Sequence, residues 1–389
     1  MTRLSRGISQ EKWQQCLAEL KSDTALFDYA VVKASEDLIY KYLLSTLAHA
    51  ITLVQNADPL NPDFVPYLNS FFNMGIPNQD TTYYFTNIDG RNSYRIYGTR
   101  GTVYFIEFQA GRGYQGVNDQ WAQSLNNNTI ADFEINDDGS FEILLSAIRP
   151  DNYEGNWMRI DPDADWFLVR QVAYGPNQSD GRFAILLEGG DAKRELSSND
   201  QLETIVSLVK GQAKLWIGSH EEMHETGAYN RFISANWDAN SIVIDQLYQH
   251  GLYDVAEDEA LIISVKEPSQ CEYWNIQVAT LLGQAHDFIN RQTCLNGHVD
   301  RADSDGFTRF VLSHKDPGVA NWVDLCGRQQ GYMLLRWLRS DSVPDPQVKK
   351  VAFGKVINHL PADTRMVSVQ ERIKTLKEQA VAIQQRRMW

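Results

Sequence analysis

The fold is decided by residues 81–108, which read TTYYFTNIDGRNSYRIYGTRGTVYFIEF. β-Branched and aromatic residues dominate three short runs in this stretch, Thr81 to Ile88, Ser93 to Tyr97 and Thr102 to Phe108. Asp89-Gly90 and Arg100-Gly101 separate the runs, and turn signals of this kind between strand-like segments favour hairpins. Because connections this short join antiparallel strands, the stretch predicts an antiparallel β-sheet.

The same strand pattern continues along the chain on both sides of a central helical segment, Asn199 to about Glu225. The further strand-like runs are Ile130 to Ile135, Ser140 to Ser146, Trp166 to Tyr174, Glu259 to Val265, Tyr273 to Leu281, Gln292 to Val299 and Phe307 to Ser313. Tyr229 to Gln249 reads as an irregular bridge. No repeat of fixed period is evident in the sequence.

Both ends of the chain have helical spacing of apolar residues. Residues 9–56 predict a helical segment with Ser9 or Ser35 as caps, and Asp58-Pro59 and the prolines after it end this segment. Val369 to Trp389 predicts a terminal helix, in which Ile373, Leu376, Ala380 and Ile383 share one face.

The expected fold class is therefore mainly β with helical additions (α+β). It comprises two antiparallel β-sandwich or jelly-roll-like layers, a helical N-terminal segment and a C-terminal helix. The expected parts are a helical N-terminal segment (1–66), a first antiparallel β domain (67–198), a helical bridge (199–250), a second antiparallel β domain carrying the candidate site (251–345) and a basic C-terminal helical segment (346–389).

Charge and composition restrict the function classes. The net charge is −14, which disfavours nucleic-acid binding because phosphate contacts need a basic face. Residues 346–389 carry nine Lys or Arg and three Asp or Glu, which makes this segment basic, and we expect its helix either to cap an acidic face or to mediate homo-oligomers. No apolar run is long enough for a membrane span or a signal peptide, and four scattered cysteines without a C-x-x-C pair favour a cytoplasmic protein.

The candidate functional site lies in the stretch from Tyr273 to Trp337, where amides, histidines, carboxylates and tryptophans are concentrated. Such groups at strand ends and turns are typical of a small-molecule site. The predicted acid–base residues are His298, His314, Asp316 and Asp324. The predicted ligand-binding residues are Tyr273, Trp274, Asn275, Arg291, Asn296, Asn321, Trp322 and Arg328.

Two other motifs admit a second interpretation. His220-Glu221-Glu222-Met223-His224 has the H-E-x-x-H spacing of zinc hydrolases, yet its extra glutamates indicate a solvated helix end and no third ligand is evident. Gly111-x-Gly113-x-x-Gly116 follows a strand, but the neighbouring hairpins favour a glycine-rich loop over a dinucleotide fingerprint. We therefore assign no metal ligand, and the sequence indicates no cofactor.

The chain resembles the family known as domain of unknown function 1214, which is related to the 1254 family. The residues that carry the resemblance are Thr81-Thr82-Tyr83, Tyr94-Arg95-Ile96, Phe167-Leu168-Val169-Arg170-Gln171, Tyr273-Trp274-Asn275-Ile276-Gln277, Asn290-Arg291-Gln292, Leu295-Asn296-Gly297-His298, His314-Lys315-Asp316-Pro317-Gly318 and Asn321-Trp322-Val323-Asp324. The resemblance implies paired antiparallel β domains with helical additions. The chain has Gly297 and Arg328 at two positions where the family pattern has histidine.

Three functions are compatible with these observations. The first is a cytoplasmic enzyme that acts on a small, largely apolar molecule with a polar or anionic group by histidine and carboxylate acid–base chemistry. The second is a β-sandwich protein that binds a small molecule or a protein without chemistry, and the third is a zinc-dependent hydrolase. The expected partner is a small-molecule ligand, with no nucleic acid and no membrane.

Overall fold

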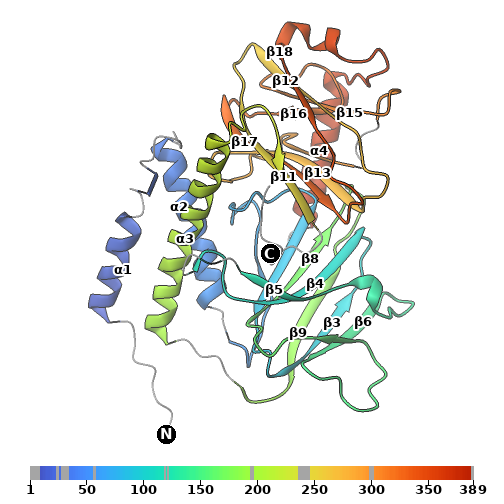
Figure 1. The fold of residues 1–389 in the computed structure, drawn as a ribbon. Coiled ribbons are helices and arrows are strands. Elements are labelled where there is room, and N and C mark those ends of the chain that lie inside the picture. Colours follow the sequence, from blue (N-terminus) through green and yellow to red (C-terminus); the bar gives the residue numbers. More distant parts are fainter. Residues whose placement is uncertain are drawn as a thin grey trace.

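The computed structural model describes residues 9–22, 26–27, 35–55, 58–117, 120, 122–192, 197–234, 246–297 and 302–386. Two β-sandwiches lie one beyond the other along the molecule, and three helices, α1, α2 and α3, stand together along one side (Figure 1). The fold is mixed α+β with four mostly antiparallel sheets, which confirms the expected fold class.

The first sandwich comprises a five-stranded and a four-stranded sheet. The five-stranded sheet has the order β1 (Val65–Pro66), β2 (Thr81–Asn87), β8 (Trp166–Val172), β4 (Phe105–Arg112) and β5 (Gln123–Thr129). The four-stranded sheet has the order β7 (Trp157–Arg159), β6 (Ser140–Ser146), β3 (Ser93–Thr99) and β9 (Arg182–Gly189). All neighbouring strands are antiparallel except β6 and β7.

The second sandwich is built in the same way. Its five-stranded sheet has the order β10 (Ile233–Ser234), β11 (Gln246–Asp254), β17 (Gln330–Leu338), β13 (Tyr273–Ala279) and β14 (Cys294–Asn296). Its four-stranded sheet has the order β16 (Trp322–Asp324), β15 (Thr308–Ser313), β12 (Glu259–Val265) and β18 (Gln347–Ala352). Strands β15 and β16 form the one parallel pair among the described strands of this sandwich.

The two sandwiches are a structural duplication. Each strand of the first has a counterpart nine strands later in the second, at the same place in the sheet and with the same direction relative to its neighbours. A short motif supports this correspondence: Asn156-Trp157 begins β7 after Ser146, and Asn321-Trp322 begins β16 after Ser313. The duplication is one of topology, and the absence of a fixed-period repeat in the sequence did not predict it.

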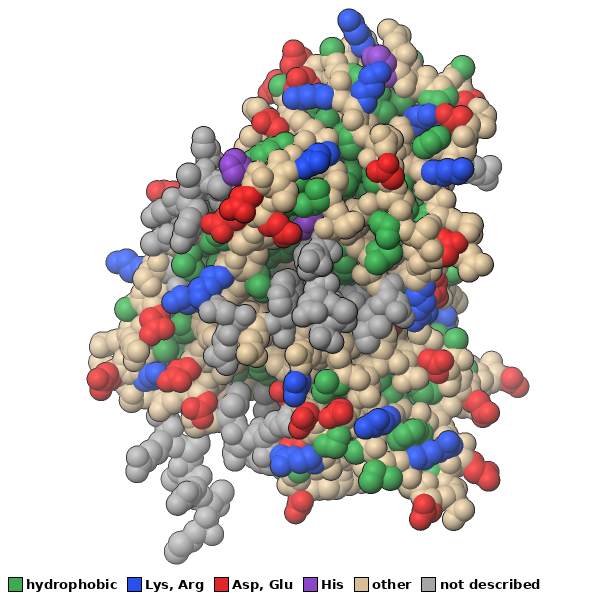
Figure 2. Space-filling model, in the orientation of Figure 1, with side chains coloured by type: hydrophobic (Ala, Val, Ile, Leu, Met, Phe, Trp, Pro, Cys, Tyr) green, Lys and Arg blue, Asp and Glu red, His purple; other side chains and the backbone are tan. Residues whose placement is uncertain are grey.

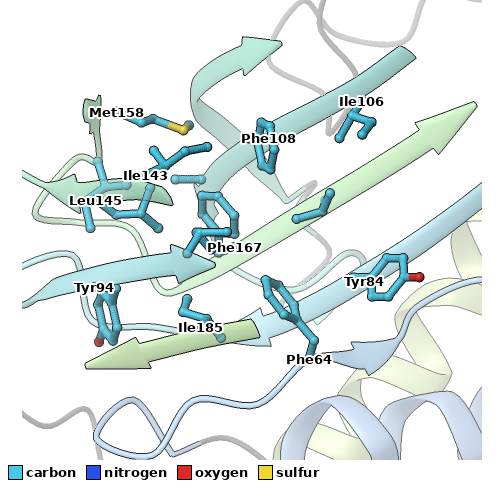
Figure 3. Close-up of a cluster of buried hydrophobic side chains, with 14 of the residues drawn as sticks. Phe64, Tyr84, Tyr94, Ile106, Phe108, Ile143, Leu145, Met158, Phe167 and Ile185 are labelled. Carbon is cyan, nitrogen blue, oxygen red and sulfur yellow. The ribbon is translucent and has the colours of Figure 1, made fainter. Parts of the chain in front are cut away.

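Each sandwich has a core between its two sheets. In the first, Phe108 and Phe167 of the five-stranded sheet face Ile143 and Leu145 of the four-stranded sheet, and all four side chains are buried (Figure 3). In the second, Trp337 belongs to the corresponding core and is fully buried. Because side chains alternate across a strand, the remaining face of each five-stranded sheet points away from its own sandwich and is free to meet other elements.

The predicted N-terminal helical segment forms two helices among the described residues, α1 (Gln10–Ser22) and α2 (Glu36–Gln55). Ser9 and Ser35 accept backbone hydrogen bonds at the starts of these helices, as expected of caps. Helix α3 (Ser198–Glu225) joins the two sandwiches and begins at a capping box formed by Ser197 and Asp200. It packs against α1 and α2 and covers the outer faces of both five-stranded sheets.

Helix α3 makes a close backbone contact with the loop that follows β4. A Cβ atom built on Gly211 would lie 1.8 Å from the carbonyl oxygen of Gly116, and Gly116 itself has φ +88°. Glycine is needed at position 116 because of the positive φ, and at position 211 because a side chain there would clash with the Gly116 carbonyl. The G-x-G-x-x-G motif is thus a strand end and loop in an antiparallel sheet, as the loop interpretation predicted.

The C-terminal segment returns to the junction between the sandwiches. A 3₁₀ helix, η4 (Phe353–His359), precedes α4 (Val369–Gln385), which starts at a capping box of Ser368 and Glu371. After α4, Arg386 donates to Asp180 Oδ1 of the first sandwich at 2.9 Å. Val369 and Ile373 remain exposed on α4, and self-association through this helix stays a prediction.

Several local predictions are corrected by the structure. Residues 130–135 are not a strand, because Asp132 accepts hydrogen bonds from the backbone and hydroxyl of Thr129 and stabilises a 3₁₀ turn, η3 (Ile130–Asp132). The irregular bridge 229–249 contains β10 and the start of β11. The predicted strand 292–299 is reduced to β14 among the described residues.

The surface agrees with the mixed composition of the chain. On the face seen in Figure 2, acidic and basic side chains are interspersed, so no extended basic area is visible there. None of the helices in the described ranges has the length and apolar character needed to cross a bilayer.

Candidate functional site

The duplication places equivalent side chains at equivalent positions of the two central strands. Arg170 lies on β8 and Arg336 on β17, and each is flanked by one residue on either neighbouring strand. The three residues of the first set are Tyr83, Arg170 and Glu107, and those of the second are Tyr248, Arg336 and Asn275. The tyrosine and the arginine are kept in both sets, and the third position differs.

A cavity of about 410 Å³ lies where the outer faces of the two five-stranded sheets approach each other. Helix α3 and residues 67–76 complete its wall. This volume is in the range of sites for small molecules. The polar side chains that line it include Tyr83, Arg170, Gln212, Ser219, Tyr248 and Arg336, and the apolar ones include Leu68, Met74, Ile76, Leu168, Leu215, Trp216 and Leu334.

Arg170 is a buried, ion-paired member of the cavity wall. Its Nη2 donates to the carboxylate of Glu107, which is also buried, and its Nη1 donates to Gln246 Oε1 at 3.3 Å. The second oxygen of Glu107 accepts a hydrogen bond from Asn127 Nδ2 at 2.7 Å. Arg170 Nε is buried and has no hydrogen-bond partner in the described part of the chain.

Arg336 is buried as well, but its contacts are with neutral groups. Its Nη1 donates to Gln277 Oε1 at 2.7 Å and to Asn275 Oδ1 at 3.3 Å, and its Nη2 donates to the carbonyl oxygen of Ile76 at 2.7 Å. No carboxylate among the described residues forms an ion pair with it. A buried guanidinium without a contacting carboxylate is costly unless a ligand supplies the opposite charge.

Tyr248 lines the same cavity and is close enough to both cations to feel their charge. Burial raises the pKa of Tyr248 to about 12, against the opposing influence of Arg336 and Arg170. Its hydroxyl is therefore protonated at neutral pH and can act as a hydrogen-bond donor. The part of the cavity wall that the two sheets supply thus combines the guanidinium groups of Arg170 and Arg336 with the phenolic O–H of Tyr248.

A buried carboxyl group lies behind this part of the wall. Asp80 accepts hydrogen bonds from the Tyr273 hydroxyl at 2.7 Å and from Asn296 Nδ2 at 2.9 Å. Burial raises the pKa of Asp80 to about 6, although these two donors and the charges of Arg386 and Arg336 lower it. Asp80 acts on Arg336 electrostatically and makes no direct ion pair with it.

The predicted site residues are distributed over several places. Tyr273 and Asn296 hold Asp80, and Asn275 contacts Arg336, so these three support the cavity from behind. Arg291, predicted as a ligand-binding residue, forms a two-point ion pair with Asp324, with Nε to Oδ2 at 2.7 Å and Nη2 to Oδ1 at 2.9 Å. This pair neutralises both side chains.

The other predicted residues fix loops and cores of the second sandwich. His314 Nε2 lies 2.8 Å from the carbonyl oxygen of Val255, and Asp316 accepts from Arg372 at 3.0 Å. Trp322 donates to the Ser313 carbonyl, Trp274 packs in the sandwich core, and Arg328 is exposed. Asn321 lines a separate cavity of about 220 Å³. His298 lies outside the described residues, and none of the other predicted site residues lines the 410 Å³ cavity.

The H-E-x-x-H histidines have different environments. His220 is buried beside Tyr332, whereas His224 is exposed, with its Nδ1 3.2 Å from the Tyr229 hydroxyl. Burial lowers the pKa of His220 to about 3, so it is neutral. Within the described ranges, no group of three or more His, Cys, Asp or Glu side chains is arranged to hold a metal ion.

The fold and the cavity together define a duplicated β-sandwich protein with a space of small-molecule size at the junction of its two halves. Residues 86–178, within the first sandwich, match the sequence model of a family described as a protein of unknown function (DUF1214), which confirms the resemblance over that range.

Two solved structures are similar to this chain over most of its length. An uncharacterized protein from Burkholderia cenocepacia is 25% identical in sequence, with a TM-score of 0.82, over 89% of this chain and 98% of that one. A protein from Vibrio parahaemolyticus is 12% identical, with a TM-score of 0.48, over 85% of this chain and 99% of that one. A search of curated proteins finds no match. The comparisons therefore supply a fold and a family match limited to residues 86–178, and no activity.

Proposed function

We propose that this protein binds a small, largely apolar molecule that carries an anionic group, in the cavity between the two sandwiches. The observation that carries the proposal is Arg336, a buried guanidinium in the cavity wall whose contacts are all neutral oxygens. An anionic ligand would supply the missing charge through charge-assisted hydrogen bonds. The apolar side chains of the wall, Trp216 and Leu334 among them, would cover the rest of the ligand.

Binding without chemistry is supported better than acid–base catalysis by the predicted histidines. The described residues that line the cavity include no histidine, cysteine or aspartate. Burial raises the pKa of Tyr248, so this side chain holds its proton more tightly than usual, which suits a hydrogen-bond donor and not a general base. We propose a cytoplasmic location because all four cysteines are unpaired, as expected in a reducing compartment.

Calorimetric titration of the purified protein with octanoate and with 1-octanol tests the proposal. The two probes have the same chain length and differ in the charge of the head group. We expect octanoate to bind about tenfold more tightly or better, since a hydrogen bond to a charged group contributes roughly 1.5–3 kcal/mol.

Two variants locate the binding. Arg336→Gln removes the cation, and it should reduce the affinity for octanoate to that for octanol. Leu215→Trp adds bulk from α3 at a half-buried position of the cavity wall, and it should weaken binding of both probes. Leu44→Trp, on the exposed side of α2, is the matched control and should bind like the unmodified protein. Equal affinity for both probes, or octanoate binding that survives Leu215→Trp, would contradict the proposal.

A further inference from the structure

The two arginines of the cavity differ in one neighbouring residue, and from this difference we infer that the ligand's polar group carries a single negative charge. Glu107 is then the residue that makes the cavity select a ligand with one negative charge over a ligand with two. This inference rests on the proposed function and deepens it, because it names the class of ligand as an amphipathic monoanion.

The difference arises at one equivalent position of the duplicated sheets. Strand β4 places Glu107 beside Arg170, and strand β13 places Asn275 beside Arg336. Glu107 forms an ion pair with its arginine, whereas Asn275 offers its arginine an amide oxygen at 3.3 Å. The cavity wall therefore contains two guanidinium groups, of which one is neutralised by direct contact.

The other charged groups near the cavity make no ion pair with Arg336 in the described part of the chain. Lys214 and Glu222, both exposed residues of α3, also line the cavity and have opposite charges. Asp80 lies behind Arg336, where it is held by neutral donors and makes no ion pair with the arginine. The guanidinium of Arg336 is thus the one cation of the buried wall that no contacting carboxylate neutralises among the described residues.

The charge of the ligand follows from these contacts. A monoanion beside Arg336 completes one ion pair, so that both guanidinium groups are then compensated. A dianion would bring a second negative charge into the same buried space, close to Glu107, and that charge would be repelled. Arg170 Nε, buried and without a partner in the described ranges, is a remaining N–H donor for a neutral oxygen or for a second oxygen of the same anionic group.

Octyl sulfate and octyl phosphate are suitable probes, because their head groups are both tetrahedral and differ in charge. At pH 8 the sulfate is a monoanion and the phosphate is mostly a dianion, since the second pKa of a phosphate monoester is about 6. Calorimetric titration with each probe gives a ratio of dissociation constants, phosphate over sulfate. We expect a ratio of about ten or more for the unmodified protein.

Two reciprocal variants test the role of the position that holds Glu107 in the first sandwich and Asn275 in the second. Glu107→Gln removes the carboxylate beside Arg170, and it should lower the ratio about tenfold by improving phosphate binding. Asn275→Asp introduces a carboxylate beside Arg336, and it should weaken binding of both probes about tenfold or more. If Glu107→Gln folds poorly, octyl phosphate and octyl sulfate should raise its midpoint of thermal unfolding by about the same amount, whereas sulfate should raise that of the unmodified protein more. Asn275→Asp gives an independent result.

The outcomes separate this inference from the proposed function. If the unmodified protein binds neither octanoate nor octyl sulfate, the proposed function fails. If it binds these monoanions but the ratio is close to one, or is the same in Glu107→Gln, then the cavity binds anions and the inference about their charge is overturned.

Discussion

Replacement of Asp80 by Asn should change how the stability of the protein depends on pH. Asp80 is buried behind the cavity, and its pKa rises from an ordinary value of 3.8 to about 6 mainly because burial disfavours the charged form. Four groups lower the pKa of Asp80 and so oppose the effect of burial. Tyr273 and Asn296 do so by donating hydrogen bonds, and Arg386 and Arg336 do so through their positive charges. The folded state therefore binds the Asp80 proton more tightly than the unfolded state does.

The magnitude follows from this difference in pKa. A carboxyl group whose pKa is raised on folding contributes stability that is fully present below its unfolded pKa, near 4, and is lost as the pH rises through the folded pKa. A change from 3.8 to about 6 corresponds to about 3 kcal/mol. Since the amide of Asp80→Asn does not titrate, the variant lacks this pH-dependent contribution.

The assay is urea-induced unfolding of both proteins at pH 4, 5, 6 and 7. Groups other than Asp80 titrate in both proteins, so their effects cancel in the difference between the two free energies of unfolding. We expect the unmodified protein to lose about 2.5 kcal/mol relative to Asp80→Asn between pH 4 and pH 7, because at pH 4 the unfolded carboxyl is already partly ionised.

An exposed carboxylate provides the control. Hydrogen bonds from Ser140 hold the pKa of Asp138 below its ordinary value, so Asp138→Asn should show a small dependence of the opposite sign, with the contribution of Asp138 lost as the pH falls. A difference between Asp80→Asn and the unmodified protein that stays constant from pH 4 to pH 7 would refute the reasoning. A difference that favours the unmodified protein as the pH rises would mean that the four groups around Asp80 outweigh its burial.

Two further predictions concern stability, both measured as shifts in the free energy of unfolding. Gly211→Ala should destabilise by about 1–3 kcal/mol, because its Cβ would lie 1.8 Å from a backbone oxygen, whereas Gly218→Ala on the same helix has open space and should stabilise by up to about 1 kcal/mol. Equal effects at the two glycines would argue against the close contact of α3. Arg386→Ala should cost about 3 kcal/mol or more, since it leaves the buried Asp180 unpaired, while Lys374→Ala at an exposed pair should stay within about 0.5 kcal/mol. A neutral Arg386→Ala would mean that the C-terminal segment does not hold the junction.

The elements that were predicted correctly are those whose signal is local. Ser140–Ser146 and Glu259–Val265 form strands with the predicted bounds. Helix α3 begins and ends within a residue of the prediction because its capping residues and apolar spacing lie in one continuous stretch. Such signals are available in a single sequence.

The strand that carries Arg336 was missed, and with it one half of the cavity. In β17, Gly331 to Leu338 are all buried, so the strand has no alternation of polar and apolar residues. A run of this kind reads equally well as a buried helix or a strand. The Asn-Trp pairs at 156–157 and 321–322 were the available signal for the duplication, and Arg170 and Arg336 follow them at nearly the same distance along the chain.

The candidate site could not be found by looking for a segment dense in polar residues. The stretch from Tyr273 to Trp337 is polar because its loops need internal partners, as the Arg291–Asp324 pair shows. The cavity instead takes a few side chains from each of several distant segments, and its polar residues are separated in sequence by apolar strands. Only the arrangement of the two sheets brings these groups together.

The position of α3 explains why the cavity belongs to the whole chain and not to either half. The helix is the connection between the duplicated sandwiches, so it has no counterpart in the repeat. It nevertheless supplies Gln212, Leu215 and Trp216 to the cavity wall, opposite the arginines that the two sheets supply. A symmetrical pair of sandwiches would present two equivalent arginines. One covering helix, and the difference between Glu107 and Asn275 at equivalent positions, make the two sides unequal, so a molecule bound as we propose would have a defined orientation.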